Sequence, residues 1–165
     1  MPKRARAIAL LLKPLWRLAL TPDVRPRNEL ALRAALAADR AMYRVTGGAQ
    51  HESGGRSVLL LTMRGRRSGQ PRSVLLTYLP HGDRLVVAAS NAGRERPPAW
   101  LLNLQAEPVA EVQVGGRQLR VRTRVAEPDE RAGLWPLFLA LSPTYEGYQR
   151  ALRREIPLVV MEAVE

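Results

Sequence analysis

Short apolar runs rich in β-branched residues recur through the last two-thirds of the chain and predict β-strands. Polar or glycine-containing segments such as RGRRSGQPR and PHGD separate them, and Gly115 with Gly116 is a strong two-residue hairpin signal. Along residues 117–125 apolar side chains alternate with arginine and glutamine, so one face should be core and the other should meet solvent or an anion. The predicted strands span residues 57–63, 73–79, 84–90, 111–114, 117–125 and 157–162.

Helical patterns interrupt this strand series at three places. One predicted helix covers residues 98–106, a second begins near Pro128 with Asp129 and Glu130 in its first turn, and a third surrounds residues 145–152. Five or six strands of antiparallel type with few helices predict a small β-barrel, which is a mainly β fold with flanking helices in the α+β class.

Two amphipathic helices are predicted before the barrel. Residues 1–20 place apolar side chains on one face and cationic side chains opposite. Two interpretations stay open, because this apolar face can pack on the domain or lie on an anionic membrane surface. The apolar run is too short to span a membrane and lacks a convincing cleavage site, so we expect the segment to stay on the protein. The apolar face consists of Ile8, Leu11, Leu12, Leu15 and Ala19, with Trp16 at its margin.

The second helix is predicted over residues 28–46, ending at Gly47 and Gly48. Its arginines lie almost opposite its apolar stripe and are interpreted as a solvated face. A polar link over residues 49–56 follows. We therefore expect an N-terminal helical extension at 1–50 and a barrel domain at 51–165. The predicted apolar stripe is Ala31, Ala35, Ala38, Met42 and Val45, and the predicted solvated stripe is Arg33, Arg40 and Arg44.

The chain is strongly basic, with 26 Lys and Arg against 15 Asp and Glu and a net charge of +11. Residues 1–125 hold 22 of the basic and 8 of the acidic side chains, so the positive charge lies away from the C-terminal quarter. Binding to nucleic acid would need exposed aromatic residues along a basic face. Only eight aromatic residues occur and most fall in apolar helices, so we expect no nucleic-acid partner.

The inventory of reactive residues excludes several kinds of chemistry. The absence of cysteine excludes disulfides, thiol catalysis and iron–sulfur ligation, so any redox role must use a bound organic cofactor. His51 and His81 have no second ligand at metal-binding spacing, and we expect no metal site. The nucleophile motif GxSxG is also absent.

The segment between the first two predicted strands is the main candidate for ligand binding. It carries Arg64, Arg66, Arg67 and Arg72 on a glycine-bounded turn. Backbone N–H groups of such a turn can approach phosphate oxygens while the guanidinium groups donate charge-assisted hydrogen bonds. A solvated basic hairpin would have a similar sequence, so both interpretations stay open.

The helix predicted over residues 98–106 offers a second candidate. Trp100 and Asn103 lie three residues apart on it and can point to one side of a pocket. For Trp100 an ordinary core position is the alternative.

Several motifs in order extend the argument beyond single residues. Over residues 57–162 the segments LLLT, GRRSGQPR, DRLVVAASNAG, PAWLLNL, VQVGG, LWPLF, YEGYQ and IPLVV follow one another. This order resembles the deazaflavin-dependent nitroreductase family, a branch of the flavin/deazaflavin oxidoreductases. The resemblance implies a split β-barrel of the FMN-binding type with coenzyme F420, an 8-hydroxy-5-deazaflavin, as the redox cofactor and FMN as a less favoured one.

The resemblance also implies the residues that hold the coenzyme. The family segment that holds the coenzyme's phosphate and acidic tail corresponds to Arg66, Arg67, Ser68 and Arg72. The family segments that form the walls around the coenzyme's ring and ribityl chain correspond to Ser73, Val74, Leu75, Leu76, Thr77, Ala88, Ala89, Ser90 and Asn91. The family helix at the edge of the coenzyme ring corresponds to the segment with Ala99, Trp100 and Asn103. Two positions depart from the family, because Asn91 stands where some members have lysine and Ala99 where some have methionine.

On the substrate side the resemblance points to Tyr145 and Tyr148, with Ser142 in place of a third family tyrosine. We expect the Tyr145 hydroxyl to donate a proton or orient the substrate, because hydride delivery from the cofactor leaves only such tasks to the protein.

The expected activity is hydride transfer from reduced coenzyme F420 to a quinone or to another conjugated or nitro acceptor. Two alternatives stay open, a deazaflavin-binding or carrier protein without catalysis and an FMN-binding enzyme of the same fold. The expected location is the cytoplasm, and if residues 1–20 lie on a membrane rather than pack on the domain, the protein is attached peripherally to the inner face of the cell membrane. The sequence leaves the oligomeric state open.

Overall fold

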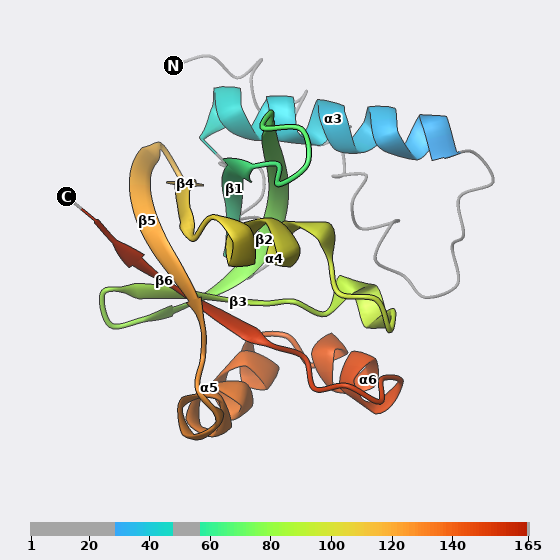
Figure 1. The fold of residues 1–165 in the computed structure, drawn as a ribbon, viewed down its shortest axis with the longest axis vertical. Coiled ribbons are helices and arrows are strands. Elements are labelled where there is room, and N and C mark those ends of the chain that lie inside the picture. Colours follow the sequence, from blue (N-terminus) through green and yellow to red (C-terminus); the bar gives the residue numbers. More distant parts are fainter. Residues whose placement is uncertain (1–28, 48–56, 165) are drawn as a thin grey trace, which may run out of the picture.

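A computed structural model, which describes residues 29–47 and 57–164, shows a closed six-stranded barrel with helices packed around it (Figure 1). The strand order is β1-β2-β3-β6-β5-β4, and every neighbouring pair is antiparallel. The strands are β1 (Val58–Arg64), β2 (Pro71–His81), β3 (Arg84–Ala88), β4 (Val109–Val114), β5 (Arg117–Val125) and β6 (Leu158–Ala163). The helices are α3 (Glu29–Thr46), the short 3-10 helix η1 (Asn91–Gly93), α4 (Ala99–Ala106), α5 (Pro128–Leu141) and α6 (Thr144–Arg150). The predicted α+β barrel with flanking helices is confirmed.

The barrel interior holds the largest apolar cluster. Side chains that alternate along β1, including Leu59 and Leu61, point inward and meet Trp100, Leu101 and other residues of α4. Helix α4 therefore contributes side chains to the barrel core, and its N-terminal end stands next to β1 and β2. This position brings α4 to the candidate site.

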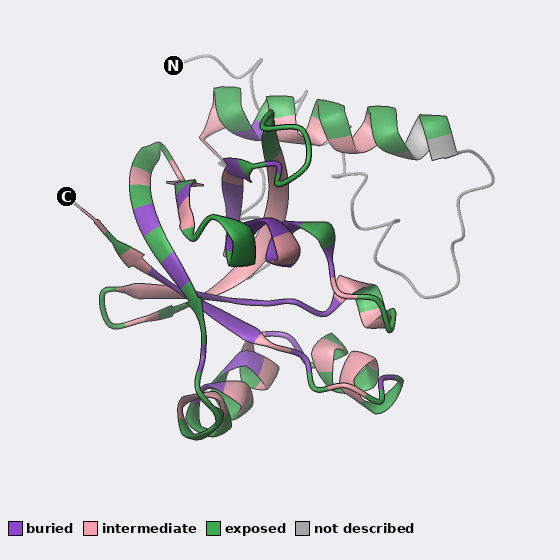
Figure 2. Ribbon diagram, viewed as in Figure 1, coloured by how far each residue is buried: buried purple, intermediate pink, exposed green. Residues whose placement is uncertain are grey.

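A second apolar cluster lies outside the barrel. Val86 and Val160 on the outer face of β3 and β6 pack against α5, where Leu134 and Phe138 are buried. Because both faces of β3 and β6 are covered, their sequences are continuous apolar runs rather than alternating ones. In Figure 2 the purple of buried residues accordingly runs along β3 and β6, whereas β5 alternates purple with green.

One ion-pair cluster fastens α5 to the barrel. Glu130 in the first turn of α5 accepts hydrogen bonds from Arg84 of β3 at 3.1 Å and from Nη2 of Arg124 of β5 at 2.9 Å. The hydrogen bonds from Arg124 hold the pKa of the Glu130 carboxyl below its usual range, and burial opposes this shift. The same pairing raises the pKa of Arg124.

The structure contradicts the predicted orientation of the second helix. Helix α3 turns Tyr43 onto the barrel, where it is 1% exposed, whereas Met42 and Val45 of the predicted apolar stripe are 37% and 86% exposed. The Tyr43 hydroxyl donates to the carbonyl oxygen of Val58 at 2.6 Å and lies 3.3 Å from that of Gln113. One large ring with a satisfied hydroxyl buries more apolar area than a stripe of alanines, so it decides the orientation.

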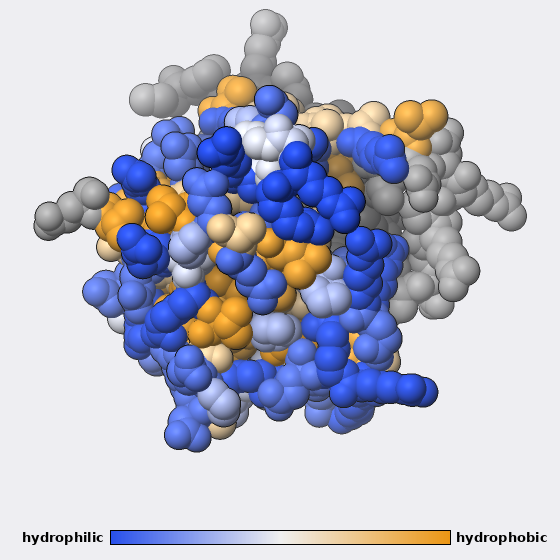
Figure 3. Space-filling view, in the orientation of Figure 1, coloured by the Kyte–Doolittle hydropathy of each residue, from blue (hydrophilic) through white to orange (hydrophobic). Residues whose placement is uncertain are grey.

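The predicted solvated stripe of this helix is also wrong in part. Arg44 donates to Ser73 Oγ of β2 at 2.6 Å, and Arg40 is half-buried at the wall of a cavity described below. In the space-filling view of Figure 3 hydrophobic side chains show near the centre of the face below α3, surrounded by hydrophilic ones. Part of the predicted solvated stripe therefore lies against the barrel or a cavity.

The other N-terminal predictions lie outside the described residues. They concern the amphipathic helix over residues 1–20 and the whole link over 49–56. The division into an extension at 1–50 and a barrel domain at 51–165 stays a prediction. Of the helices in residues 29–47 and 57–164, none has the length and apolar character needed to cross a membrane.

Candidate functional site

The arginine turn, residues 65–70, connects β1 to β2 and is closed by its own backbone. Gly65 N donates to the Gln70 carbonyl oxygen at 2.9 Å, and Gly69 N donates to that of Gly65 at 2.7 Å. Gly69 has a φ of +66°, a conformation that favours glycine because a side chain would crowd the backbone. The turn thereby presents Arg66 and Arg67 next to α4 rather than along the strands.

Asn103 of α4 holds this turn in place. Its Oδ1 atom accepts hydrogen bonds from Arg66 N at 3.3 Å and from Arg66 Nη1 at 3.1 Å. Both Trp100 and Asn103 are buried and border the same cavity, and Trp100 also belongs to the barrel core. The side chain of Asn103 is therefore a link between the arginine turn and the helix.

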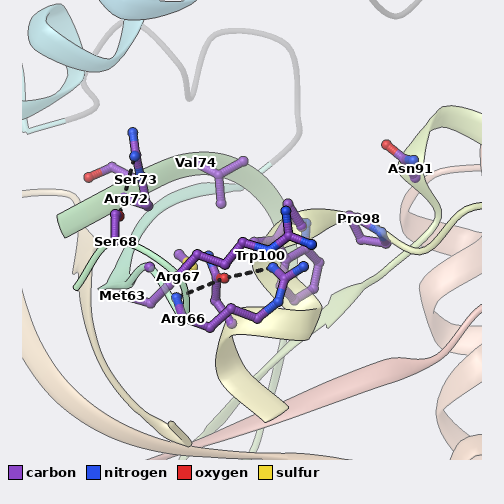
Figure 4. A pocket seen from close by; sticks show the side chains of 13 residues that line it. Met63, Arg66, Arg67, Ser68, Arg72, Ser73, Val74, Asn91, Pro98 and Trp100 are labelled. Atoms are coloured by element: carbon purple, nitrogen blue, oxygen red, sulfur yellow. Dashed lines mark hydrogen bonds between the residues drawn. The ribbon is translucent and has the colours of Figure 1, made fainter. Parts of the chain in front are cut away.

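A cavity of 460 Å³ opens between the turn, β2, η1 and α4, and we call it the arginine cavity. Figure 4 shows the side chains of Arg66 and Arg67 extending toward Trp100, with Arg72, Ser68 and Ser73 at the other end and Asn91 across the opening. Its lining consists of Met63, Gly65, Arg66, Arg67, Ser68, Arg72, Ser73, Val74, Asn91, Pro98, Ala99, Trp100 and Asn103.

The guanidinium groups of the arginine cavity differ in how they are already bonded. Arg66 Nη1 donates a hydrogen bond to Asn103 Oδ1, and Arg72 Nη2 makes a long contact of 3.4 Å to Ser68 Oγ. Arg67 makes no hydrogen bond or ion pair in the part of the chain that the structure describes. Arg67 and Arg72 are thus the cations most available to an anionic ligand.

A second cavity of 360 Å³ adjoins the first, and we call it the Tyr145 cavity. The two share Val74, Asn91, Pro98 and Trp100 as a common wall. The remaining lining of the Tyr145 cavity consists of Leu36, Asp39, Arg40, Val58, Leu75, Leu76, Thr77, Ala88, Ser90, Ala92, Arg94 and Tyr145. Residues from α3, β1, β2, β3, η1, α4 and α6 therefore meet at one place.

Most of the residues predicted for the site line one of these cavities, but three line neither. Ala89 is fully buried and faces the barrel core. Ser142 is buried at the C-terminal end of α5. Tyr148 packs against the ring of Tyr145 at a centroid distance of 5.7 Å. A direct role of these three in ligand binding stays a prediction.

Sequence reasoning missed the contribution of α3. Leu36, Asp39 and Arg40 line the Tyr145 cavity because Tyr43 fixes the helix with this face toward the barrel. The hydrogen bond from Arg44 to Ser73 Oγ links α3 to β2. Ser73 Oγ in turn lies within hydrogen-bond distance, 2.9 Å, of Thr62 Oγ1 on β1. A single tyrosine gives no periodic signal, so the pattern of the helix could not reveal this face.

Comparison with known proteins adds an independent finding. Residues 35–163 match the family described as F420H(2)-dependent quinone reductase. The chain belongs to this family. The prediction of a deazaflavin-dependent oxidoreductase that uses coenzyme F420 is thereby confirmed, and the family description names quinone rather than nitro reduction.

Individual relatives agree with the family assignment. An F420H(2)-dependent quinone reductase of Mycobacterium tuberculosis is 35% identical over 126 residues, which are 73% of this chain and 85% of the relative. A solved F420-H2 dependent reductase (FDR-A) is 32% identical with a TM-score of 0.61, covering 65% of this chain and 95% of that chain. A solved structure described as a domain-swapped dimer is 26% identical with a TM-score of 0.63, covering 80% of this chain and 99% of that chain.

Asn91 lies at the start of η1, where the two cavities meet. Its φ of 50° lies in the left-handed region, which asparagine adopts more readily than most residues. Its Nδ2 donates to the Arg96 carbonyl oxygen at 2.8 Å. Here the residue therefore stabilises the η1 turn through its own side chain.

Proposed function

We propose that this protein transfers a hydride from reduced coenzyme F420, bound in the arginine cavity, to a quinone bound in the Tyr145 cavity. The observation that carries the proposal is the common wall formed by Val74, Asn91, Pro98 and Trp100. Hydride transfer requires the donor and acceptor rings to be in contact, and adjoining cavities hold two ligands in that relation.

The chemistry of the arginine cavity fits the coenzyme. Arg67 and Arg72 would bind its phosphate and acidic tail through charge-assisted hydrogen bonds. Ser68 and the turn backbone add neutral donors beside them. When bound, the reduced coenzyme supplies the hydride, so the protein needs no metal or nucleophile of its own for this step.

The apolar walls would orient the two rings. Val74 and Trp100 line both cavities, and Leu76 lines the Tyr145 cavity. Apolar side chains here exclude water and leave a flat, adaptable surface for aromatic ligands.

Tyr145 is the proposed proton donor. One hydride and one proton together convert a quinone to its hydroquinone, a two-electron reduction. The Tyr145 hydroxyl would give this proton to a quinone oxygen and recover one from solvent, because the residue is half-buried at the cavity wall. Its ring is held edge-on by Phe138 at a centroid distance of 4.8 Å, which fixes the direction of the hydroxyl.

Arg40 would bind the acceptor. It is half-buried in the wall of the Tyr145 cavity, and its side chain forms no hydrogen bond or ion pair within residues 29–47 and 57–164. A guanidinium in this position gains a partner when a quinone oxygen enters the cavity.

The test mixes the purified full chain with reduced coenzyme F420 and a menadione-type quinone without oxygen. The proposal expects oxidised coenzyme and hydroquinone to form in equal amounts, and a lower rate for Tyr145→Phe with unchanged coenzyme affinity. Tight coenzyme binding without turnover would instead favour the carrier alternative. Tighter binding of FMN than of coenzyme F420 would favour the flavin alternative.

Two finer proposals concern acceptors and location. Nitro compounds would enter the same cavity as quinones and compete with them. Residues 1–20 would hold the enzyme at an anionic membrane surface, where quinones are dissolved. Sedimentation with anionic vesicles tests the second proposal, because the full chain should pellet at low salt and a chain without residues 1–20 should not.

A further inference from the structure

The segment of residues 89–95 has an unusual backbone. Asn91, Ala92 and Gly93 adopt φ values of 50°, 52° and 73° in succession. An alanine in the left-handed region is disfavoured, because its Cβ crowds the backbone. Such a conformation persists only when its surroundings determine it.

The hydrogen bonds within the segment are few. Gly93 N donates to the Ser90 carbonyl oxygen at 3.1 Å, and Arg94 N donates to that of Asn91 at 3.2 Å. Residues of this segment border the proposed ligand cavities, since Asn91 lines both and Ser90 lines the Tyr145 cavity. The shape of the cavity wall thus depends on contacts from elsewhere in the chain.

One guanidinium group supplies most of the hydrogen bonds that reach this segment from elsewhere in the chain. Arg154, between α6 and β6, donates through Nε to the Glu95 carbonyl oxygen at 2.8 Å and through Nη2 to that of Arg94 at 3.1 Å. Longer contacts of 3.4 Å reach the carbonyl oxygens of Ala89 and Ser90. A planar group with five donors in fixed directions therefore holds both ends of the segment.

Arg154 is itself held from the side of α6. Gln149 Nε2 donates to the Arg154 carbonyl oxygen at 2.9 Å, and Gln149 Oε1 accepts from Ile156 N at 2.8 Å. The neighbouring Arg153 N donates to Glu95 Oε1 at 2.8 Å through its backbone only. The side chain of Arg153 is exposed and has none of these bonds, so it offers a matched control.

We propose that Arg154 is a positioning residue that fixes the left-handed turn at residues 91–93 and thereby the wall of the acceptor cavity. Arg154 lines neither the arginine cavity nor the Tyr145 cavity. Its effect on turnover rests on the proposed function, whereas its effect on the turn does not.

The first experiment measures hydrogen exchange in the full chain, followed by mass spectrometry of peptides covering residues 89–96. The amides of Gly93 and Arg94 should exchange about tenfold faster in Arg154→Met than in wild type, because local opening becomes easier. Arg153→Met should exchange as wild type does. Unchanged exchange in a folded Arg154→Met protein would overturn the proposal. If Arg154→Met does not fold, Arg154→Lys carries the same comparison, since lysine keeps the charge but not the fork of donors.

The second experiment measures kinetics on the same variants. Arg154→Met should raise the quinone KM about fivefold while the coenzyme Kd changes less than about twofold, because a loosened wall holds the acceptor poorly. Arg154→Lys should lie between Arg154→Met and wild type. Equal weakening of both ligands, or a lowered melting temperature with wild-type kinetics, would contradict a positioning role. A wild-type enzyme without turnover would defeat the proposed function, and the exchange result would still decide the role of Arg154.

Discussion

The Oδ1 atom of Asn103 lies 3.1 Å from Arg66 Nη1 and 3.3 Å from Arg66 N, so one buried amide holds both the side chain and the backbone of this arginine. The contact separates the roles of neighbouring arginines. Arg66 fastens the turn to α4, whereas Arg67 stays available for a ligand.

Asn103→Ala should therefore loosen the arginine turn. We expect a loss of about 1–2 kcal/mol in the free energy of unfolding, because a buried hydrogen-bonded group is removed. We also expect a severalfold weaker coenzyme Kd. Calorimetry and a binding titration measure the two effects, and Gln105→Ala, at an exposed position of the same helix, is the control. Coenzyme affinity equal to wild type would show that the turn needs no such support.

Arg40→Met should separate acceptor binding from coenzyme binding. Loss of one charge-assisted hydrogen bond should raise the quinone KM by about tenfold, which corresponds to about 1.4 kcal/mol. The coenzyme Kd should stay close to that of wild type. Arg117→Met removes the same charge at an exposed position of β5 and should change neither constant. A weaker coenzyme Kd in Arg40→Met would place Arg40 with the coenzyme instead.

Gly93→Ala should destabilise the protein through two effects. Gly93 has a φ of +73°, and an added Cβ would lie 3.1 Å from Cδ1 of Tyr148. We expect a loss of about 1–2 kcal/mol in a thermal or denaturant melt. Gly147→Ala is the control, because no atom lies within 4 Å of its Cβ position and alanine favours the helix. A Gly93→Ala protein as stable as wild type would refute the tight contact.

The ion pair at the start of α5 predicts a dependence of stability on pH. The pKa of Glu130 is lower in the folded protein than its ordinary value of 4.5, so the stabilisation is present above that pH and is lost as the pH falls through the lowered pKa. Glu130→Gln should cost about 0.5–1 kcal/mol near neutral pH and progressively less in acid. Melts over a pH series measure this difference, with the exposed Asp129→Asn as the control. A difference that stays constant down to strongly acidic pH would refute the pairing.

The strands were predictable because their patterns are local. The predicted range 117–125 coincides with β5, and the hairpin at Gly115 and Gly116 precedes it. Strand β2 is longer than predicted, because Pro71 pairs with Arg64 of the neighbouring strand β1 and His81 pairs with Arg84 of the neighbouring strand β3. Its ends depend on partner strands and carry no apolar signal of their own.

The site was predictable only in part. The arginine turn is contiguous in sequence, so its residues could be recognised together. The contribution of α3 could not, because it depends on the seating of Tyr43 against Val58. Arg154 lies 59 residues from Glu95, and nothing in the local sequence indicates that it supports the turn at residues 91–93.

The affinity for coenzyme F420 of the double variant Arg67→Ala with Arg72→Ala tests the central claim most directly. The account predicts that the free energy of coenzyme binding weakens by about 2–4 kcal/mol while the protein still folds. Charge-assisted hydrogen bonds contribute to binding, whereas charges on a surface loop contribute little to stability. Affinity of the wild type should also fall with added salt. The exposed pair Arg117→Ala with Arg122→Ala removes equal charge from β5 and should bind almost as wild type does. A folded Arg67→Ala with Arg72→Ala protein that binds the coenzyme as tightly as wild type would contradict the account.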